Sequence, residues 1–263
     1  MKFLRINNVY ALILIPVFIA NLTLDLTSGD YGDADIPDVN TFSIVAYDPE
    51  TGDLGVAVQS KFLAVGSVVP WAKAGIGAIA TQSYANTKYG PDGLDLLKWK
   101  KTPTEVIKLL TDGDKNKENR QIGIVNSLGM SASHTGKKCH GYAGHSTGKN
   151  FAIQGNLLAS KKVIEHMEIG YLKTKDQNDQ RYPFPQRLIN ALKGAQSQGG
   201  DRRGRQSAAL LIVRKNGGYA GLNDRFIDIR VDDHETPIVE LERLLRLHEK
   251  FYPKEHSVYS KVK

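Results

Sequence analysis

Hydrophobic residues occupy nearly every position of several short segments of this chain. The first two, Thr41–Tyr47 and Leu54–Ser60, are separated only by the turn residues Asp48–Asp53. A loop this short joins antiparallel neighbours. Because a sheet with one solvated face would alternate apolar and polar residues, these segments predict strands that are covered on both faces. The same pattern recurs in Gly75–Gln82, Phe151–Gly155 and Ser207–Val213.

Apolar residues at helical spacing predict helices around these strands. Thr102 and Glu105 form a capping box with Pro103 at the first helical position, and Asp112 and Gly113 end that helix. Further helices are expected over Leu157–Tyr171, over Pro185–Ala195, and from a cap at Thr236 to a stop at Pro253. Strands covered on both faces, with helices to cover them, predict an α+β fold: a four-layer αββα sandwich of two mainly antiparallel sheets between helices.

The first 40 residues have a different pattern. Lys2 and Arg5 precede the apolar run Val9–Ala20, which at twelve residues is shorter than the roughly 20 that a spanning helix needs. This order is typical of a secretory signal, so we expect a secreted or extracytoplasmic protein, with an uncut N-terminal membrane anchor as the alternative. The expected organisation is a signal peptide at 1–29, a linker or pro-segment at 30–40, one domain at 41–252 and a C-terminal tail at 253–263.

Composition narrows the class of protein further. Among 263 residues, 41% are hydrophobic and 24% charged, which is ordinary for a globular fold and excludes a disordered chain or a polytopic membrane protein. The single cysteine excludes a disulfide framework within the chain and a cysteine-based zinc cage. The net charge is +7, and the first 40 residues carry two cations against five aspartates. The remaining body is therefore basic, which suits an anionic partner or indicates a solvated basic surface.

Thr41 combines a reactive side chain with an unusual position. It is the first residue of the first expected strand and directly follows a segment that processing would remove. The α-amine of an N-terminal threonine, with a reference pKa of about 7.7–8.0, can accept the hydroxyl proton, whereas a peptide nitrogen cannot. Cleavage before Thr41 would therefore create a nucleophile. An ordinary strand threonine is the alternative interpretation.

Several segments of the chain together resemble the domain of unknown function 1028 family. They are Thr41–Ala46, Gly55–Gly66, Gly77–Gln82, Tyr89–Pro91, Arg120–Gln121, His134–Gly136, Gln154–Asn156 and Gly199–Ala209. The resemblance extends from Thr41 to about His248. This family is regarded as similar to the N-terminal nucleophile hydrolases, whose αββα sandwich agrees with the expected layers. The resemblance implies hydrolysis of an amide bond by Thr41, without a cofactor.

The resemblance also implies roles for other residues. Val56–Lys61 is similar to the second strand of proteasome-type subunits, although Gln59 stands where those subunits have an acid. Lys73 precedes the third strand, where that group keeps a lysine that holds the amine neutral and steadies an oxyanion. Asn156 is a candidate oxyanion donor or, alternatively, a helix-capping residue. We also expect three residues to contact substrate: Ser60, Gln82 and His145.

Charged residues are concentrated just before the last apolar strand. Asp201 is expected to pair with one arginine, leaving the others to hold a substrate carboxylate; the arginines are Arg202, Arg203 and Arg205. Without interleaved aromatic residues, this cluster does not indicate nucleic acid. A nearby cluster of His134, Cys139, His140 and His145 matches no standard zinc spacing, so we expect no metal.

Two functional hypotheses follow from these observations. The first is an exported amide-bond hydrolase that uses Thr41 after processing, on a small-molecule or peptide substrate that carries a carboxylate. The second is an inactive binding or structural protein on the same fold. A homo-oligomer is compatible with both. Residues 30–40 would remain attached after removal of the signal peptide. The hydrolase requires a second cleavage between Asn40 and Thr41, so the N-terminus of the mature protein distinguishes the two hypotheses.

Overall fold

Two antiparallel sheets form the centre of the fold. The computed structural model describes residues 39–260, all within the second of the chain's two units, Ile36–Lys263. One sheet has six strands in the order β10 (Arg225–Val231), β9 (Ser207–Val213), β2 (Leu54–Ser60), β1 (Thr41–Tyr47), β8 (Phe151–Leu158) and β7 (Tyr142–Gly148). The other has four, in the order β3 (Pro70–Lys73), β4 (Gly77–Ser83), β5 (Arg120–Asn126) and β6 (Ser131–Thr135). The expected signal peptide lies outside the described residues.

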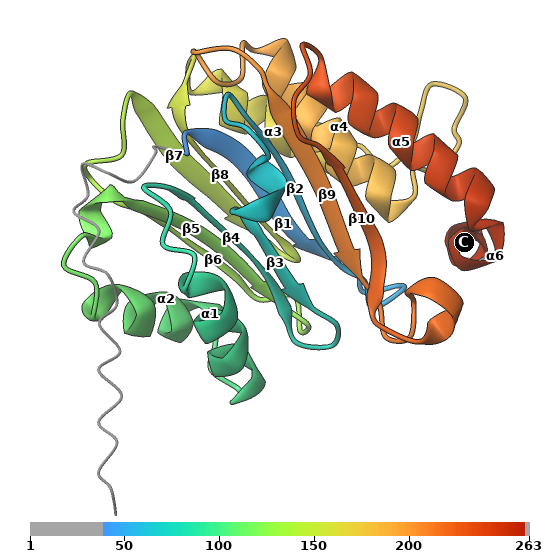
Figure 1. Ribbon diagram of the computed structural model, residues 1–263, viewed down its shortest axis with the longest axis horizontal. Helices are drawn as coiled ribbons and strands as arrows, with labels where there is room; N and C mark the ends of the chain where they lie inside the picture. The colour runs from blue at the N-terminus through green and yellow to red at the C-terminus, as the bar shows by residue number, and fades with distance from the viewer. Residues whose placement is uncertain (1–38, 261–263) are drawn as a thin grey trace, which may run out of the picture. The chain divides into compact units, whose positions relative to one another are not determined.

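Helices cover the outer face of each sheet (Figure 1). The six-stranded sheet packs against α3 (Lys162–Leu172), α4 (Phe184–Ser197) and α5 (Pro237–Phe251). The four-stranded sheet packs against α1 (Tyr89–Lys98) and α2 (Pro103–Asp112). A short helix, α6 (Pro253–His256), follows α5. The fold is therefore the four-layer α+β sandwich that the sequence predicts.

The strands divide the buried side chains into separate layers. Successive residues of a strand point to opposite faces, so Ile44 of β1 packs under the helices while Val45 packs between the sheets. In the four-stranded sheet, Ile79 likewise faces its helices and Ala80 faces the other sheet. Odd and even positions of these strands are both apolar because both faces of each sheet are covered, as the sequence pattern indicates.

Some element boundaries differ from the expected ones. The capping box of α2 forms as predicted, with Thr102 Oγ1 accepting from the Glu105 backbone N–H. The helix expected from Leu157 begins instead at Lys162, because β8 continues to Leu158. Thr236 precedes α5, but its side chain makes no capping hydrogen bond.

The segment expected as a C-terminal tail packs back onto the domain as far as Ser260. The Tyr259 hydroxyl donates to Asp53 Oδ2 at 2.5 Å, and Arg214 Nη1 donates to the Glu255 carbonyl at 2.8 Å. Arg214 also makes two hydrogen bonds to the Asp53 carboxylate, each 2.7 Å long. These contacts hold the C-terminal segment on the helix-covered side of the six-stranded sheet.

Candidate functional site

The layer between the sheets changes from apolar to polar along its strands. On β1 the residues that face this layer are Tyr47 and Val45 at one end, then Ser43 and Thr41 at the other. The neighbouring strands change in the same direction, because Thr41 pairs with Ser60, and Ser60 pairs in turn with Ser207 of β9. We call the half of the layer that contains Thr41 the polar end, and the half that contains Val45 the apolar end.

Side-chain amides from both sheets form a hydrogen-bond network at the polar end. Ser43 Oγ donates to Gln82 Oε1 at 2.6 Å and accepts from Gln154 Nε2 at 2.7 Å. Gln121 Oε1 accepts from Gln82 Nε2 at 2.7 Å and from Asn156 Nδ2 at 2.9 Å. All five residues are fully buried. Because buried polar groups are costly without partners, this network fixes the positions of the strands around Thr41.

The peptide bond between Asn40 and Thr41 lies against this network. Two groups donate to the Asn40 carbonyl oxygen: Ser60 Oγ at 2.5 Å and Arg203 Nη2 at 2.8 Å. The Thr41 hydroxyl donates to the Val39 carbonyl at 2.9 Å, and the Thr41 carbonyl accepts from the Gln82 amide at 3.3 Å. Two donors on one oxygen polarise that carbonyl and would stabilise negative charge on it.

Asp201 holds Arg203 in place, which matches the expected pairing with one arginine. Its carboxylate accepts from Arg203 Nε at 3.1 Å and from Arg203 Nη2 at 2.8 Å. It also accepts from the backbone N–H of Lys61 at 3.1 Å. The Asp201 side chain is completely buried. The forked contact orients the guanidinium so that Nη2 also reaches the Asn40 carbonyl.

The other two arginines of the cluster lie at the surface. Arg202 and Arg205 are both exposed. Arg205 and Lys61 line an open hollow of about 370 Å³ beyond the end of β2, together with Asp233, His234 and Glu235. The hollow is large enough for a small ligand. Its lining carries both signs of charge.

Lys73 lies at the other end of the sheets. It is the last residue of β3 and pairs with Gly77, the first residue of β4. Thr41 is close to Ser83, the last residue of β4, because Val39 bridges to Ser83. Seven strand residues separate the two positions by about 20 Å. The structure therefore does not bring Lys73 to Thr41. The cation that hydrogen-bonds to the carbonyl preceding Thr41 is Arg203.

Asn156 and His145 join the polar end through Gln121. Asn156 donates to Gln121 rather than capping a helix. Gln121 Nε2 donates to Thr135 Oγ1 at 2.9 Å, and this hydroxyl contacts His145 Nδ1 at 2.9 Å. Burial and the charge of His134 lower the pKa of His145. His145 thus lies two hydrogen bonds from the centre of the network and does not contact Thr41.

The rest of the histidine and cysteine cluster is spread over separate partners. His134 contacts the Lys117 carbonyl at 3.0 Å, and the Cys139 thiol contacts the Arg120 carbonyl at 3.4 Å. Between residues 39 and 260, no group of three or more His, Cys, Asp or Glu side chains is arranged to hold a metal ion. Within the same range, no helix is long and apolar enough to cross a membrane.

Three members of the network were not predicted from the sequence: Ser43, Gln121 and Gln154. A signal was present, because each is a polar residue at a position that the strand alternation directs between the sheets. The same alternation places Gln59 on the helix-covered face, with Ala57, and not beside Thr41. Gln59 therefore has no contact through which to relay a proton to Thr41.

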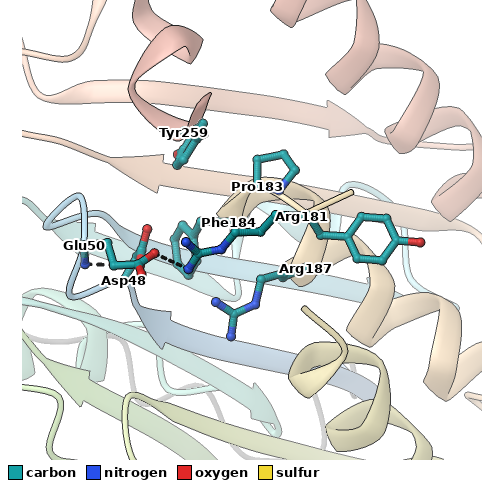
Figure 2. A pocket seen from close by; sticks show the side chains of 8 residues that line it. Asp48, Glu50, Arg181, Pro183, Phe184, Arg187 and Tyr259 are labelled. Atoms are coloured by element: carbon teal, nitrogen blue, oxygen red, sulfur yellow. Dashed lines mark hydrogen bonds and ion pairs between the residues drawn. The ribbon is translucent and has the colours of Figure 1, made fainter. Parts of the chain in front are cut away.

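A separate cavity lies at the opposite end of β1, next to the turn that follows Tyr47 (Figure 2). Figure 2 shows the Arg181 guanidinium bonded to Glu50, with the Arg187 guanidinium nearby. Burial raises the pKa of Asp48 in its wall. The cavity holds about 20 Å³, which is room for one water molecule and too little for a substrate.

Comparisons with known proteins identify the family. A crystal structure of a Silicibacter pomeroyi protein of DUF1028 is 28% identical, with a TM-score of 0.70, over 80% of this chain and 89% of that chain. The Anbu (ancestral beta-subunit) protein from Yersinia bercovieri is 11% identical, with a TM-score of 0.35, over 85% of this chain and 98% of that chain. No match was found among curated proteins. The family model described as "Family of unknown function (DUF1028)" matches residues 41–241. The chain therefore belongs to the DUF1028 family.

Proposed function

We propose that this protein is an exported amide-bond hydrolase whose nucleophile is Thr41, freed by cleavage of the Asn40–Thr41 bond. The observation that carries this proposal is the pair of donors on the Asn40 carbonyl, one peptide bond from the threonine hydroxyl. A carbonyl that accepts a short hydroxyl bond and a charge-assisted guanidinium bond is prepared for attack. The family match also begins at Thr41.

The first step is self-cleavage. Thr41 Oγ1 attacks the Asn40 carbonyl carbon, the C–N bond breaks, and the hydroxyl proton passes to the leaving nitrogen, which becomes the Thr41 amine. The product is an ester between Asn40 and the Thr41 side chain. Water then hydrolyses the ester to an Asn40 carboxylate and a free hydroxyl. Ser60 and Arg203 donate to the carbonyl oxygen while it carries negative charge in both steps.

Turnover on a substrate reuses the same groups. The free Thr41 amine accepts the hydroxyl proton, which an amide nitrogen cannot do. Ser60 and Arg203, one peptide unit away, stay in place to donate to the substrate carbonyl oxygen. Arg203 thus takes the oxyanion-stabilising role expected for Lys73. The network through Gln82 holds the Thr41 backbone while the side chain reacts.

The substrate in this proposal is a small molecule or peptide that carries a carboxylate. Arg202, Arg205 and Lys61 supply exposed cations near the polar end. A carboxylate would bind them by charge-assisted hydrogen bonds. Duplex nucleic acid is not a proposed partner, because Asp233 and Glu235 stand among these cations. Binding of acidic amides, compared with neutral ones at two salt concentrations, measures this preference.

The test of the nucleophile is the mass and N-terminal sequence of the secreted protein. We expect the wild-type chain to begin at Thr41 and to hydrolyse amides in a substrate screen. Thr41→Ala should keep residue 40 attached and lose at least about 1,000-fold in turnover, whereas Thr41→Ser should still process. Thr111→Ala, at a buried threonine of α2, is the matched control.

An active wild-type chain with Asn40 still joined to Thr41 would contradict this mechanism. A wild-type chain that neither processes nor hydrolyses any amide would instead favour the inactive binding protein. The two results are distinguished by the same mass measurement together with the amide screen.

A further inference from the structure

The two residues before Thr41 lie in the fold as an extended ligand would. The Val39 N–H donates to the Ser83 carbonyl at 2.9 Å, and the Ser83 N–H donates to the Val39 carbonyl at 3.0 Å. This is an antiparallel bridge onto the end of β4. Val39 and Asn40 are each only 3% exposed. Their backbone therefore uses the same hydrogen bonds that an added peptide strand would use.

The position of the reacting carbonyl links this segment to a substrate. One nucleophile attacks both carbonyls, first that of Asn40 and later that of the substrate, so both carbonyl oxygens must reach the same donors, Ser60 and Arg203. The acyl side of the substrate must then follow the path that Val39 and Asn40 take in the uncut chain. When the cleaved segment leaves, that path is open.

We propose that the groove occupied by Val39 and Asn40 is the acyl-side subsite of the enzyme, and that its substrate is an extended peptide with a compact apolar residue next to the residue whose carbonyl is attacked. This inference rests on the proposed function. It names a peptidyl amide as the substrate class, because the bridge to Ser83 requires a backbone N–H and a backbone carbonyl on the substrate.

Side-chain surroundings define the preference of this subsite. Val39 packs in the apolar cluster between the sheets, which also contains Val69 and has Ala85 packed against it. A charged residue at this position would lose its hydration without a partner, so the subsite excludes it. Ser83 has a φ of 67°, and its buried hydroxyl has no hydrogen-bond partner among residues 39–260. That hydroxyl is available to a substrate group.

Peptide binding without chemistry tests the subsite. The probe is a capped Val-Asn dipeptide amide, and the protein is the full chain carrying both Val39→Asp and Thr41→Ala. Val39→Asp should expel the chain's own segment from the apolar cluster, and Thr41→Ala prevents cleavage. Titration calorimetry should show binding to this double variant. The chain carrying only Thr41→Ala, whose segment still fills the groove, should bind at least tenfold more weakly.

Two altered peptides identify the contacts. The N-methyl-Val peptide cannot donate to the Ser83 carbonyl, and the Asp-Asn peptide cannot enter the apolar cluster. Each should bind at least tenfold more weakly than the Val-Asn peptide. Equal binding of all three, or no binding by any, overturns the subsite. Val39→Gly in place of Val39→Asp gives the same comparison in a chain with no buried charge, should the aspartate variant fail to fold.

Amide hydrolysis by the processed wild-type chain separates this inference from the proposed function. If the Val-Asn peptide binds more tightly than the altered peptides but no amide is hydrolysed, the subsite is supported and the proposed hydrolase is contradicted. If amides are hydrolysed without preference for the Val-Asn peptide and the three peptides bind equally, the hydrolase is supported and the subsite is contradicted.

Discussion

The two ends of the layer between the sheets are built from the same strands but held together differently. At the apolar end, Val45, Val56 and Val125 pack side chain to side chain. At the polar end, Ser43 and Gln121 occupy equivalent positions on β1 and β5 and bond through shared amides. Apolar packing tolerates small shifts, whereas a hydrogen bond needs a fixed distance and angle. The contrast separates the part that stabilises the fold from the part that positions Thr41.

The largest effect on stability is expected at the apolar end. Leu54→Ala removes a fully buried side chain from this cluster and should lower the free energy of unfolding by about 2–5 kcal/mol. Processing at Asn40–Thr41, measured by mass at a temperature where the variant is folded, should be unchanged. A processing rate that falls along with stability would show that the two ends are not independent.

A loss of rate with little loss of stability is expected at the polar end. Arg203→Lys keeps a positive charge but loses the fork that reaches both Asp201 and the Asn40 carbonyl. Processing should slow by about 100-fold, which corresponds to about 2.7 kcal/mol of transition-state stabilisation. Arg205→Lys, at an exposed position, is the matched control. Equal processing rates in the two variants would contradict a role for Arg203 in cleavage of the Asn40–Thr41 bond.

A glycine in β5 tests how rigid the network is. A Cβ placed on Gly123 would lie 1.8 Å from Gln154 Oε1, so Gly123→Ala must displace that amide from Ser43. The displaced amide stays buried without its partner, and the free energy of unfolding should fall by about 1–3 kcal/mol. Gly113→Ala, with open space around it, should change stability by less than about 0.5 kcal/mol. Chemical denaturation measures both variants.

The smallest effect concerns acid and the C-terminal segment, where His256 packs against Phe226 on the helix-covered face of the six-stranded sheet. Burial, followed by the charges of His248 and Arg214, lowers the pKa of His256 to about 4. Above the unfolded value of 6.5, neither state binds this proton, so stability is fully present there. As the pH falls from 6.5 toward 4, only the unfolded chain gains the proton, and stability is lost.

After allowance for partial solvent exposure, this loss should be about 1 kcal/mol. The His256→Gln variant should show a smaller difference in urea midpoint between pH 7 and pH 4.5 than the wild type. His166→Gln on α3 is the control. Identical pH dependence of the wild type and His256→Gln would exclude His256 as the source.

The pattern of the sequence predicts the strands of the fold better than the arrangement of the site. The predicted ranges Thr41–Tyr47 and Leu54–Ser60 match β1 and β2 residue for residue. Apolar residues at both odd and even positions mark the bounds of these strands clearly. The half-buried or exposed strands β6 and β7, whose residues are mostly polar or small, were not predicted from the sequence, and neither were β3, β5 and β10. Low burial explains β6 and β7. It does not explain β5, which is fully buried.

The arrangement of the site could not be predicted from local patterns, because it depends on contacts between segments that are far apart in the sequence. Lys73 follows Thr41 at a plausible distance along the chain, but the register of β3 on β4 places it at the wrong end. Arg203 and Ser60 are 143 residues apart and meet on one carbonyl. Local patterns predict which strands pair as hairpins. They do not predict which end of one sheet faces which end of the other.

The close approach of Gly123 to Gln154 restricts the order in which related sequences can change. A side chain at position 123 fits only after the residue at position 154 has become shorter, because both would occupy the same space between β5 and β8. Shortening Gln154 first costs its bonds to Ser43 but causes no overlap. The reverse order passes through a crowded intermediate. The two positions are therefore expected to show a large coupling energy in a double-mutant cycle, and position 154 is expected to change before position 123.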